Sequence, residues 1–410
     1  MSAPPPQAWL NALLRLVQEA QLALLHLWHA LGWSGEVHGQ PAWPWPQRIA
    51  GETLVIDLGL ARQFGLAVLA VALALACIAI AMFWRRRRLM WLGIGALALV
   101  LAPWPSPALL LTPAAPTSFH QSPTGFAVRS IADGARLYAQ HCAACHGSDG
   151  RGEGPLAATL SRWPPTFLSP LLGRRAEGEL FWHIVAGMRD GSGRTTMPAF
   201  GHEIDDVQVW AVIDYMKALA AGTGSTVQGN WPVPLRLPDV MVRCGTAAPR
   251  SLADWRGDQR VRVVASDGAR SALPLEDPRF LTLLVTPDGR PPVDFPADIR
   301  ADIPPPNSQF RADCVAASPQ AWPVFARIAG IEPARLAGTT WLADRDGWLR
   351  AQAAAGDIGW SDASLVCTAG QPASREAGSP AIRAPVDGLT ALLLRLDAEP
   401  VRFVQGGFVH

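Results

Sequence analysis

The sequence predicts a multidomain chain in which N-terminal transmembrane helices precede an all-α domain and then an α/β domain. Three observations indicate this order: a run without charge at residues 66–84, a cysteine-histidine motif between two helical patterns, and strand-like segments further on. A chain of 410 residues is too long for one ordinary hydrophobic core. With 49% hydrophobic and 17% charged residues, it is also too apolar for a wholly soluble protein. The expected parts are a membrane region at 1–115, a helical domain at 126–222, a linker at 223–237 and an α/β domain at 238–410.

A membrane-spanning hairpin is predicted near the N-terminus. Residues 66–84 carry no charge, and a helix of that length spans roughly 28 Å, close to the hydrocarbon thickness of a bilayer. Four arginines follow at 85–88, and a second uncharged segment at 89–111 has three prolines near its end. Loops rich in arginine stay in the cytoplasm, so the chain after residue 111 is expected on the opposite side. In the inner membrane of a bacterium, that side is the periplasm.

The N-terminal segment 9–31 is long and apolar enough for a third span, which is the favoured interpretation. Arg15 and Glu19 lie in its middle, where charges are costly, but their spacing of four residues allows them to pair. A helix lying flat on the membrane surface is the alternative. His26 and His29 lie one turn apart and are read as boundary side chains, with a second metal or a b-type haem site as the alternative.

The charge pattern excludes one class of partner. The formal net charge is +1, and apart from the four consecutive arginines the basic residues are thinly spread. Proteins that bind nucleic acid need a basic face or stripe, so no nucleic-acid partner is expected. The membrane is the first predicted partner.

Residues 142–146 read Cys-Ala-Ala-Cys-His and form the most informative motif of the chain. In such a motif on a starting helix, the two thiols reach the two vinyl groups of one porphyrin, and the next imidazole lies beneath its iron. Cys142 and Cys145 are therefore predicted to attach one haem c covalently, with His146 as an iron ligand. A zinc site or a redox-active cysteine pair is the alternative.

Two helical patterns flank this motif. ADGARLYAQH places Gly134 and Tyr138 on a helix before it, and DDVQVWAVIDYMKAL supplies an apolar stripe after an acidic cap. With the motif, these segments resemble a class I cytochrome c domain over residues 130–222. The resemblance implies an all-α cytochrome c domain whose two helices cross closely at Gly134. It also implies a methionine as second iron ligand: Met197 in TTMPAFG matches the family's MPxF pattern, and Met188 is the weaker candidate.

The same resemblance implies further roles around the haem. Pro155 occupies the place of the family's proline whose carbonyl accepts the second N–H of the axial histidine. Arg194, Trp163 and Trp182 are candidates for contacts with the haem propionates or edge, and ordinary packing explains each equally well. Protein ligands would fill both axial positions of the iron, so oxygen chemistry is not expected. The domain is therefore read as an electron carrier and not as an enzyme.

The C-terminal part has the element order of an α/β domain. Strands are expected at 260–266 and 280–289, a helix at 318–331 and a hairpin at 344–347. This order resembles a thioredoxin-like domain over about 238–370. No paired-cysteine motif follows the first of these strands, and Gly338 stands where the family has a cis-proline. Thiol–disulfide exchange is therefore not expected of this domain.

Three cysteines are left for the C-terminal part: Cys244, Cys314 and Cys367. Two of them are expected to form a structural disulfide in the periplasm, and the sequence does not choose the pair. Copper binding by these thiols is the alternative. The apolar tail after residue 387 carries charges and is not expected to be another span.

These features predict a membrane-anchored, periplasmic, monohaem c-type cytochrome that moves electrons between redox proteins of the periplasm or the membrane. Two alternatives stay open. One is the electron-transfer subunit of a dehydrogenase or terminal oxidase complex. The other is a copper-handling or assembly protein with an accessory haem domain.

Overall fold

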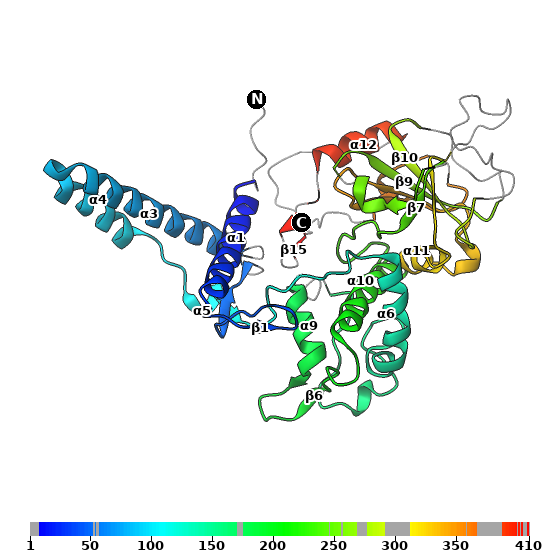
Figure 1. Cartoon of the computed structure of the whole chain (residues 1–410), viewed down its shortest axis with the longest axis horizontal. Coiled ribbons are helices and arrows are strands. Elements are labelled where there is room, and N and C mark those ends of the chain that lie inside the picture. Colours follow the sequence, from blue (N-terminus) through cyan, green and yellow to red (C-terminus); the bar gives the residue numbers. More distant parts are fainter. Residues whose placement is uncertain are drawn as a thin grey trace, which may run out of the picture. The chain divides into compact units, whose positions relative to one another are not determined.

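The computed structural model shown in Figure 1 describes residues 8–51, 54, 57–169, 175–245, 247–255, 257–268, 277–291, 312–357, 359–366, 388–399, 401, 403–404 and 408–409. The chain divides into two compact units. The first comprises Met1–His120, Arg174–Trp182 and Arg402–Phe408; the second comprises Gln121–Gly173, His183–Val401 and Val409–His410. Helix α9 begins in the first unit and ends in the second.

The first unit holds the N-terminal helices and two short antiparallel ribbons, in which β1 pairs with β2 and β3 pairs with β4. Helices α3 and α4 lie side by side as a hairpin (Figure 1). The Asp57 carboxylate accepts the Leu60 N–H at 3.0 Å and caps the start of α3. The elements are α1 (Ala8–Ala30), β1 (Glu36–Val37), β2 (Gln40–Pro41), β3 (Gln47–Ile49), α3 (Leu58–Phe83), η1 (Arg85–Arg87), α4 (Arg88–Leu101), α5 (Pro107–Leu110), β4 (Leu111–Pro113) and β14 (Phe403–Val404).

One helix in the described part of the chain is long and apolar enough to cross a membrane, by length and composition alone: Gly59–Phe83 of α3. The expected second span at 89–111 is wrong as a single helix, because α4 ends at Leu101 after 14 residues. The prolines that follow have no N–H to continue the helix. The indole N–H of Trp104 instead donates to the Leu99 carbonyl at 2.9 Å and satisfies one acceptor of the last turn.

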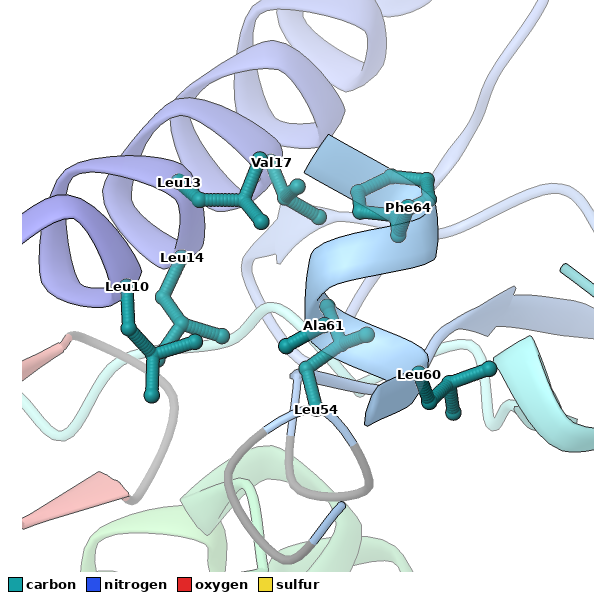
Figure 2. Close-up of a cluster of buried hydrophobic side chains, with 8 residues drawn as sticks. All are labelled: Leu10, Leu13, Leu14, Val17, Leu54, Leu60, Ala61 and Phe64. Carbon is teal, nitrogen blue, oxygen red and sulfur yellow. The ribbon is translucent and has the colours of Figure 1, made fainter. Parts of the chain in front are cut away.

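Helix α1 packs one face against the start of α3 (Figure 2). Its buried leucines and valine recur at the i, i+3, i+4 and i+7 spacing of an amphipathic helix. The cluster consists of Leu10, Leu13, Leu14, Val17, Leu54, Leu60, Ala61 and Phe64. Although α1 covers the predicted segment 9–31, it is not among the helices apolar enough to span.

The second unit begins with the predicted helical domain. Its elements are α6 (Val128–His141), α7 (Ala143–His146), η2 (Ala157–Thr159), the end of α9 (Glu177–Ala186), β5 (Met188–Arg189), β6 (Thr195–Met197) and α10 (Asp206–Gln228). The close crossing of α6 and α10 is confirmed, because a Cβ at Gly134 would overlap the carbonyl oxygen of Ala211. The acidic cap is confirmed as well: Asp205 and Gln208 form a reciprocal capping box at the start of α10.

The C-terminal part of the second unit is built on one mixed sheet of seven strands, ordered β13-β12-β9-β10-β11-β7-β8. Strands β9, β10 and β11 are parallel, and the flanking pairs are antiparallel. The predicted strands, helix and hairpin are confirmed within a few residues. The elements are β7 (Met241–Arg243), β8 (Arg250–Ser251), η3 (Leu252–Trp255), β9 (Arg260–Ala265), β10 (Phe280–Val285), β11 (Cys314–Ala316), α11 (Ala321–Ala329), η5 (Pro333–Arg335), β12 (Thr340–Ala343), β13 (Leu349–Ala353), η6 (Asp362–Ser364) and α12 (Gly388–Ala398); β15 (Phe408–Val409) follows.

Helices cover both faces of this sheet. Because side chains alternate along a strand, Trp341 and Leu342 of β12 point to opposite faces. Trp341 packs on Phe325 of α11, with ring centroids 5.1 Å apart. Leu342 belongs to a buried cluster with Leu392, Leu393 and Leu396 of α12. The apolar tail is thus a sheet-covering helix.

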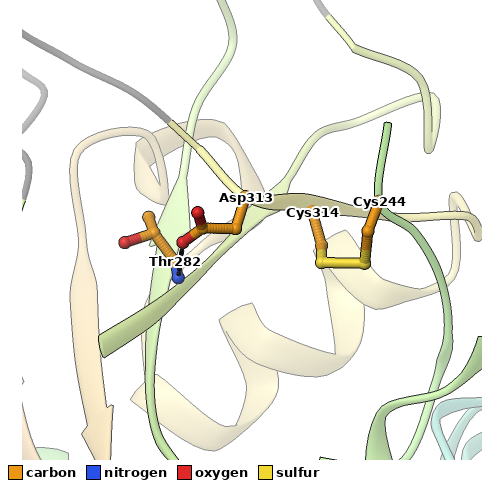
Figure 3. The surroundings of a disulfide bond; sticks show 4 residues. All are labelled: Cys244, Thr282, Asp313 and Cys314. Carbon is orange, nitrogen blue, oxygen red and sulfur yellow. Dashed lines mark hydrogen bonds between the residues drawn. A yellow bond between two sulfur atoms is a disulfide. The ribbon is translucent and has the colours of Figure 1, made fainter. Parts of the chain in front are cut away.

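A disulfide joins two neighbouring strands of the sheet (Figure 3). Cys244 directly follows β7, and Cys314 is the first residue of β11, which pairs with β7. The expected disulfide is therefore confirmed, and its pair is Cys244 with Cys314. Cys367 lies outside the described residues.

The helical domain and the sheet domain meet along α10 and α11. Gly222 and Gly330 allow this approach, since a Cβ at Gly222 would overlap the Arg327 carbonyl and one at Gly330 would overlap the Gly222 carbonyl. Helix α10 continues to Gln228, six residues into the segment expected as a linker at 223–237. The packing of Gly222 against α11 explains why the helix persists there.

Candidate metal centre

The two motif cysteines and the histidine lie on one helical turn. Cys142 ends α6, where its N–H donates to the Tyr138 carbonyl at 2.9 Å. Its own carbonyl accepts the N–H groups of Cys145 at 3.1 Å and His146 at 2.9 Å. Residues three and four apart share a face of a helix, so the two sulfur atoms and the imidazole project from the same side. All three side chains are half-buried.

A glycine-rich loop fixes the shape of this turn. The N–H groups of Gly152, Gly154 and Leu156 donate to the carbonyls of His146, Cys145 and Ala144, respectively, at 2.8–3.1 Å. A Cβ at Gly154 would lie 2.5 Å from the Ala144 carbonyl oxygen, so only glycine permits this contact. The loop therefore satisfies the carbonyls that the short helix α7 leaves free.

The His146 imidazole is held in an apolar setting. Its ring stacks on Phe167 at a centroid distance of 5.2 Å and an interplanar angle of 27°. Nδ1 is buried and makes no hydrogen bond of acceptable geometry. Burial lowers the pKa of His146, and the nearby backbone carbonyl of Pro165 opposes that shift in part. The imidazole is therefore held neutral, which is the form that ligates a metal.

A backbone carbonyl that acts on the pKa of His146 is that of Pro165, and the expected role of the Pro155 carbonyl stays a prediction. The chain brings Pro165 there because its segment packs on the glycine loop. The Phe167 N–H donates to the Gly150 carbonyl at 2.8 Å, and a Cβ at Gly152 would overlap the Pro164 carbonyl. In the sequence, this segment is marked by the Pro164-Pro165 pair ahead of Phe167.

The state of the cysteines favours attachment over redox exchange. Cys142 and Cys145 are free thiols in this structure. Burial, followed by the neighbouring Cys145, raises the pKa of the Cys142 thiol to about 12. Cysteines that exchange disulfides have lowered pKa values, and the pKa of Cys142 is shifted in the opposite direction. In a haem-attached protein the same sulfur atoms would be thioethers.

Met197 lies at the end of a short hairpin. It stands directly opposite Met188 in the β5–β6 register, so both side chains project from the same face of the ribbon. Gly187 adopts a left-handed φ of 71°, and a Cβ there would lie 2.7 Å from the Met197 carbonyl oxygen. Both methionines are half-buried. The structure therefore holds both together, and the MPxF pattern is what distinguishes Met197.

Buried aromatic side chains line the helix behind the motif. The Tyr138 hydroxyl donates to the Gly147 carbonyl at 2.7 Å, and its ring lies 5.2 Å from Tyr215 and 6.1 Å from Phe167. Tyr138 is 2% exposed, and burial raises the pKa of its hydroxyl. This packing keeps water from one side of the motif.

The remaining candidate residues are placed as follows. Arg194 is exposed and pairs with Asp190 at 3.0 Å, Trp163 is exposed, and Trp182 is half-buried. His29 Nδ1 lies 3.1 Å from the Ser34 carbonyl and its Nε2 lies 3.5 Å from Glu36, while His26 is exposed. Within the described ranges, no group of three or more His, Cys, Asp or Glu residues is arranged to hold a metal ion.

Comparison with known proteins identifies the domain around the motif. Residues 129–216 match the model of a family described as cytochrome c oxidase, cbb3-type, subunit III. The chain therefore contains a cytochrome c domain, a class of domain that carries haem c and transfers electrons. The match covers about a fifth of the chain. A search of curated proteins finds no match.

One similar solved structure is a chain of a reducing HAO-like protein complex from Kuenenia stuttgartiensis. The two sequences are 22% identical over 31% of this chain, with a TM-score of 0.21. The present chain spans 59% of the length of that chain. A TM-score this low does not establish a shared overall fold.

Proposed function

We propose that this chain, which contains a cytochrome c domain, is a membrane-anchored, monohaem c-type cytochrome of the periplasm. Cys142 and Cys145 would attach the haem, and His146 and Met197 would bind its iron from opposite sides. The observation that carries the proposal is the single helical turn that presents two free thiols and one half-buried imidazole together.

The residues of the site fit a haem. The bound iron would take up and release one electron, and a methionine thioether favours its reduced state. His146 offers a neutral nitrogen, and Pro165 lies where a backbone carbonyl orients the imidazole. Phe167 and Tyr138 exclude water from the proximal side. Both protein ligands would stay in place in the two oxidation states, which limits reorganisation.

The N-terminal hairpin supports membrane anchoring. Side chains of α3 and α4 such as Leu69, Leu75 and Val100 are exposed to an extent that suits lipid and not water. Arg85–Arg87 form η1 between the two helices and Arg88 begins α4, so by the positive-inside bias this loop would lie in the cytoplasm. Helix α4 is about 21 Å long and too short to cross alone, so the extended Pro-rich segment after it would complete the return.

The disulfide supports a periplasmic location for the second unit. Disulfides persist in oxidising compartments and are rare in the cytoplasm. Cys244 and Cys314 are bonded to each other. The attachment of haem to a CxxCH motif is expected on the same side of the membrane, so two independent features agree.

The sheet domain would act as a thioredoxin-like scaffold without thiol chemistry. Strand β9 leads into Ser266-Asp267-Gly268, where a thioredoxin-like enzyme has its cysteines. Gly338 takes the place of the cis-proline, and its N–H donates to the Ala265 carbonyl at 2.8 Å. The two bonded cysteines lie on other strands. This domain would therefore support the haem domain through α11.

An alternative is the electron-transfer subunit of a dehydrogenase or terminal oxidase complex, and the match to a family described as a cytochrome c oxidase subunit favours the oxidase. Co-purification of a catalytic subunit would support it. A copper-handling role is the other alternative, and it would first require reduction of the bond between Cys244 and Cys314. Stoichiometric copper on the purified, reduced protein would support that role.

The test is a set of spectra and a redox titration on the purified chain. Colour that survives acid–acetone extraction would establish covalent haem, and a mass equal to the bare chain would overturn it. Met197→Ala should abolish the weak red absorption band of sulfur-ligated ferric haem and lower the midpoint potential. Met188→Ala is the matched control on the same face of the ribbon and should leave both unchanged. The opposite pattern would assign the ligand to Met188.

A further inference from the structure

A buried ion pair lies in the first unit. The Arg48 Nε donates to the Glu179 carboxylate at 2.6 Å, and the two residues are 5% and 8% exposed. Arg48 belongs to β3, and Glu179 to the first turn of α9. A charge pair so far from water needs good geometry and further hydrogen bonds to be stable.

Additional contacts hold the start of α9 at this place. The Thr117 hydroxyl donates to the Gly178 carbonyl at 2.5 Å, and the Ser118 hydroxyl donates to Glu179 at 3.4 Å. A Cβ at Gly178 would overlap the Thr117 carbonyl, so the backbone of α9 lies against residue 117. Both hydroxyl residues are buried. The beginning of α9 is thus fixed by charge, hydrogen bonds and close packing.

The other end of α9 carries the methionine loop. The carbonyls of Ile184 and Val185 accept the N–H groups of Phe200 and Gly201, at 2.9 and 3.1 Å. Gly187, which follows the helix, packs against the backbone of Met197 and Ala199. The end of the MPxF segment is therefore bonded to the last turn of the same helix whose first turn carries Glu179.

We infer that Arg48 and Glu179 are positioning residues for the axial methionine, acting through α9. The inference rests on the proposed role of Met197. The helix is 10 residues long, about 15 Å, and its backbone hydrogen bonds connect its first turn to its last. A shift or fraying of its first turn would move the carbonyls that hold Phe200 and Gly201. The Met197 sulfur would then bind the iron in a smaller fraction of molecules.

The experiment removes the pair in the full chain, purified in detergent. Arg48→Met deletes the guanidinium but keeps the apolar stem, and Glu179→Gln removes the charge at nearly constant shape. Arg350→Met is the matched control, because Arg350 forms a similarly buried pair with Asp344 at 3.0 Å in the sheet domain. Arg48→Lys retains the charge. Haem content, the red sulfur-to-iron band and the midpoint potential are measured for each protein.

We expect Arg48→Met and Glu179→Gln to keep their covalent haem but to lose intensity in the sulfur-to-iron band and to show a lower midpoint potential. Arg48→Lys should recover part of the band. Arg350→Met should unfold more easily yet keep the wild-type band and potential. Should Arg48→Met fail to accumulate, the milder Glu179→Gln decides the matter.

A wild-type band and potential in both variants would overturn the inference, and so would an equal loss in Arg350→Met, which would indicate a general effect of destabilisation. Met197→Ala separates this result from the proposed function. If that variant loses the band while Arg48→Met and Glu179→Gln keep it, only the positioning role fails. If Met197→Ala itself keeps the band, the ligand assignment fails and the positioning role fails with it.

Discussion

The crossing of α6 and α10 yields a prediction whose sign can be worked from the structure. Gly134→Ala adds one methyl group in the middle of a helix. Helix propensity alone favours alanine over glycine by about 1 kcal/mol. Against this, the new Cβ would overlap the Ala211 carbonyl oxygen and would lie 2.9 Å from the Tyr215 Cβ.

The steric clash at Gly134→Ala should outweigh the gain in helix propensity. The nearest neighbour is backbone, which cannot rotate away, so the two helices must separate. Overpacking of a filled core typically costs about 1–3 kcal/mol, and a clash with rigid backbone belongs at the upper end. After the gain in propensity, we expect a net loss of about 2 kcal/mol in the free energy of unfolding.

Chemical denaturation followed by the haem absorption measures this loss. Gly93→Ala on α4 is the control, because a Cβ there has no atom within 4 Å, and it should leave the unfolding of the haem domain unchanged. A Gly134→Ala protein that unfolds at the same or a higher denaturant concentration than the wild type would refute the reasoning.

Three further predictions concern buried groups of the second unit. Asp214→Ala leaves the hydroxyls of Thr124 and Ser130 without their buried acceptor. It should lower the free energy of unfolding by about 2–3 kcal/mol in a denaturant titration. Reduction of the bond between Cys244 and Cys314, which closes a separation of 70 residues, should lower it by about 2–4 kcal/mol, and an unchanged denaturation midpoint would contradict this. Burial raises the pKa of Asp344 above its usual value of 3.8, so its proton stabilises the fold most at acid pH and this contribution fades as the pH rises through the raised pKa. The stability of the wild type relative to Asp344→Asn should therefore fall as the pH rises above the usual pKa of 3.8, and a constant difference would exclude the shift.

The parts of this fold that follow from sequence are those with local signals. The helices around Cys142 and the capping box at Asp205 are marked by apolar spacing and by cap residues that lie close in the chain. The hairpin at Asp344 is marked by its turn residues, and the structure has it at the expected place. The motif itself determines where the candidate site lies.

The features that the sequence did not predict depend on contacts between residues distant in the chain, or on which of two competing sequence signals is stronger. The pair of Arg48 and Glu179 joins positions 131 residues apart, and no local pattern links them. Pro165 is identified only once the loop has folded onto His146. At residues 89–111 the apolar composition predicted one helix, but the prolines after Leu101 ended it. The disulfide pair needed the adjacency of β7 and β11.

Helix α10 limits how the protein can be dissected. A truncated protein that ends at Gly222 would lose the last part of the continuous helix α10. It would also lack Thr223, whose hydroxyl donates to the Asp149 carbonyl of the glycine-rich loop at 2.8 Å. It would also lack α11, which packs against Gly222. Exchange of the cytochrome domain between proteins would therefore keep these contacts of α10 only if the sheet domain were transferred with it.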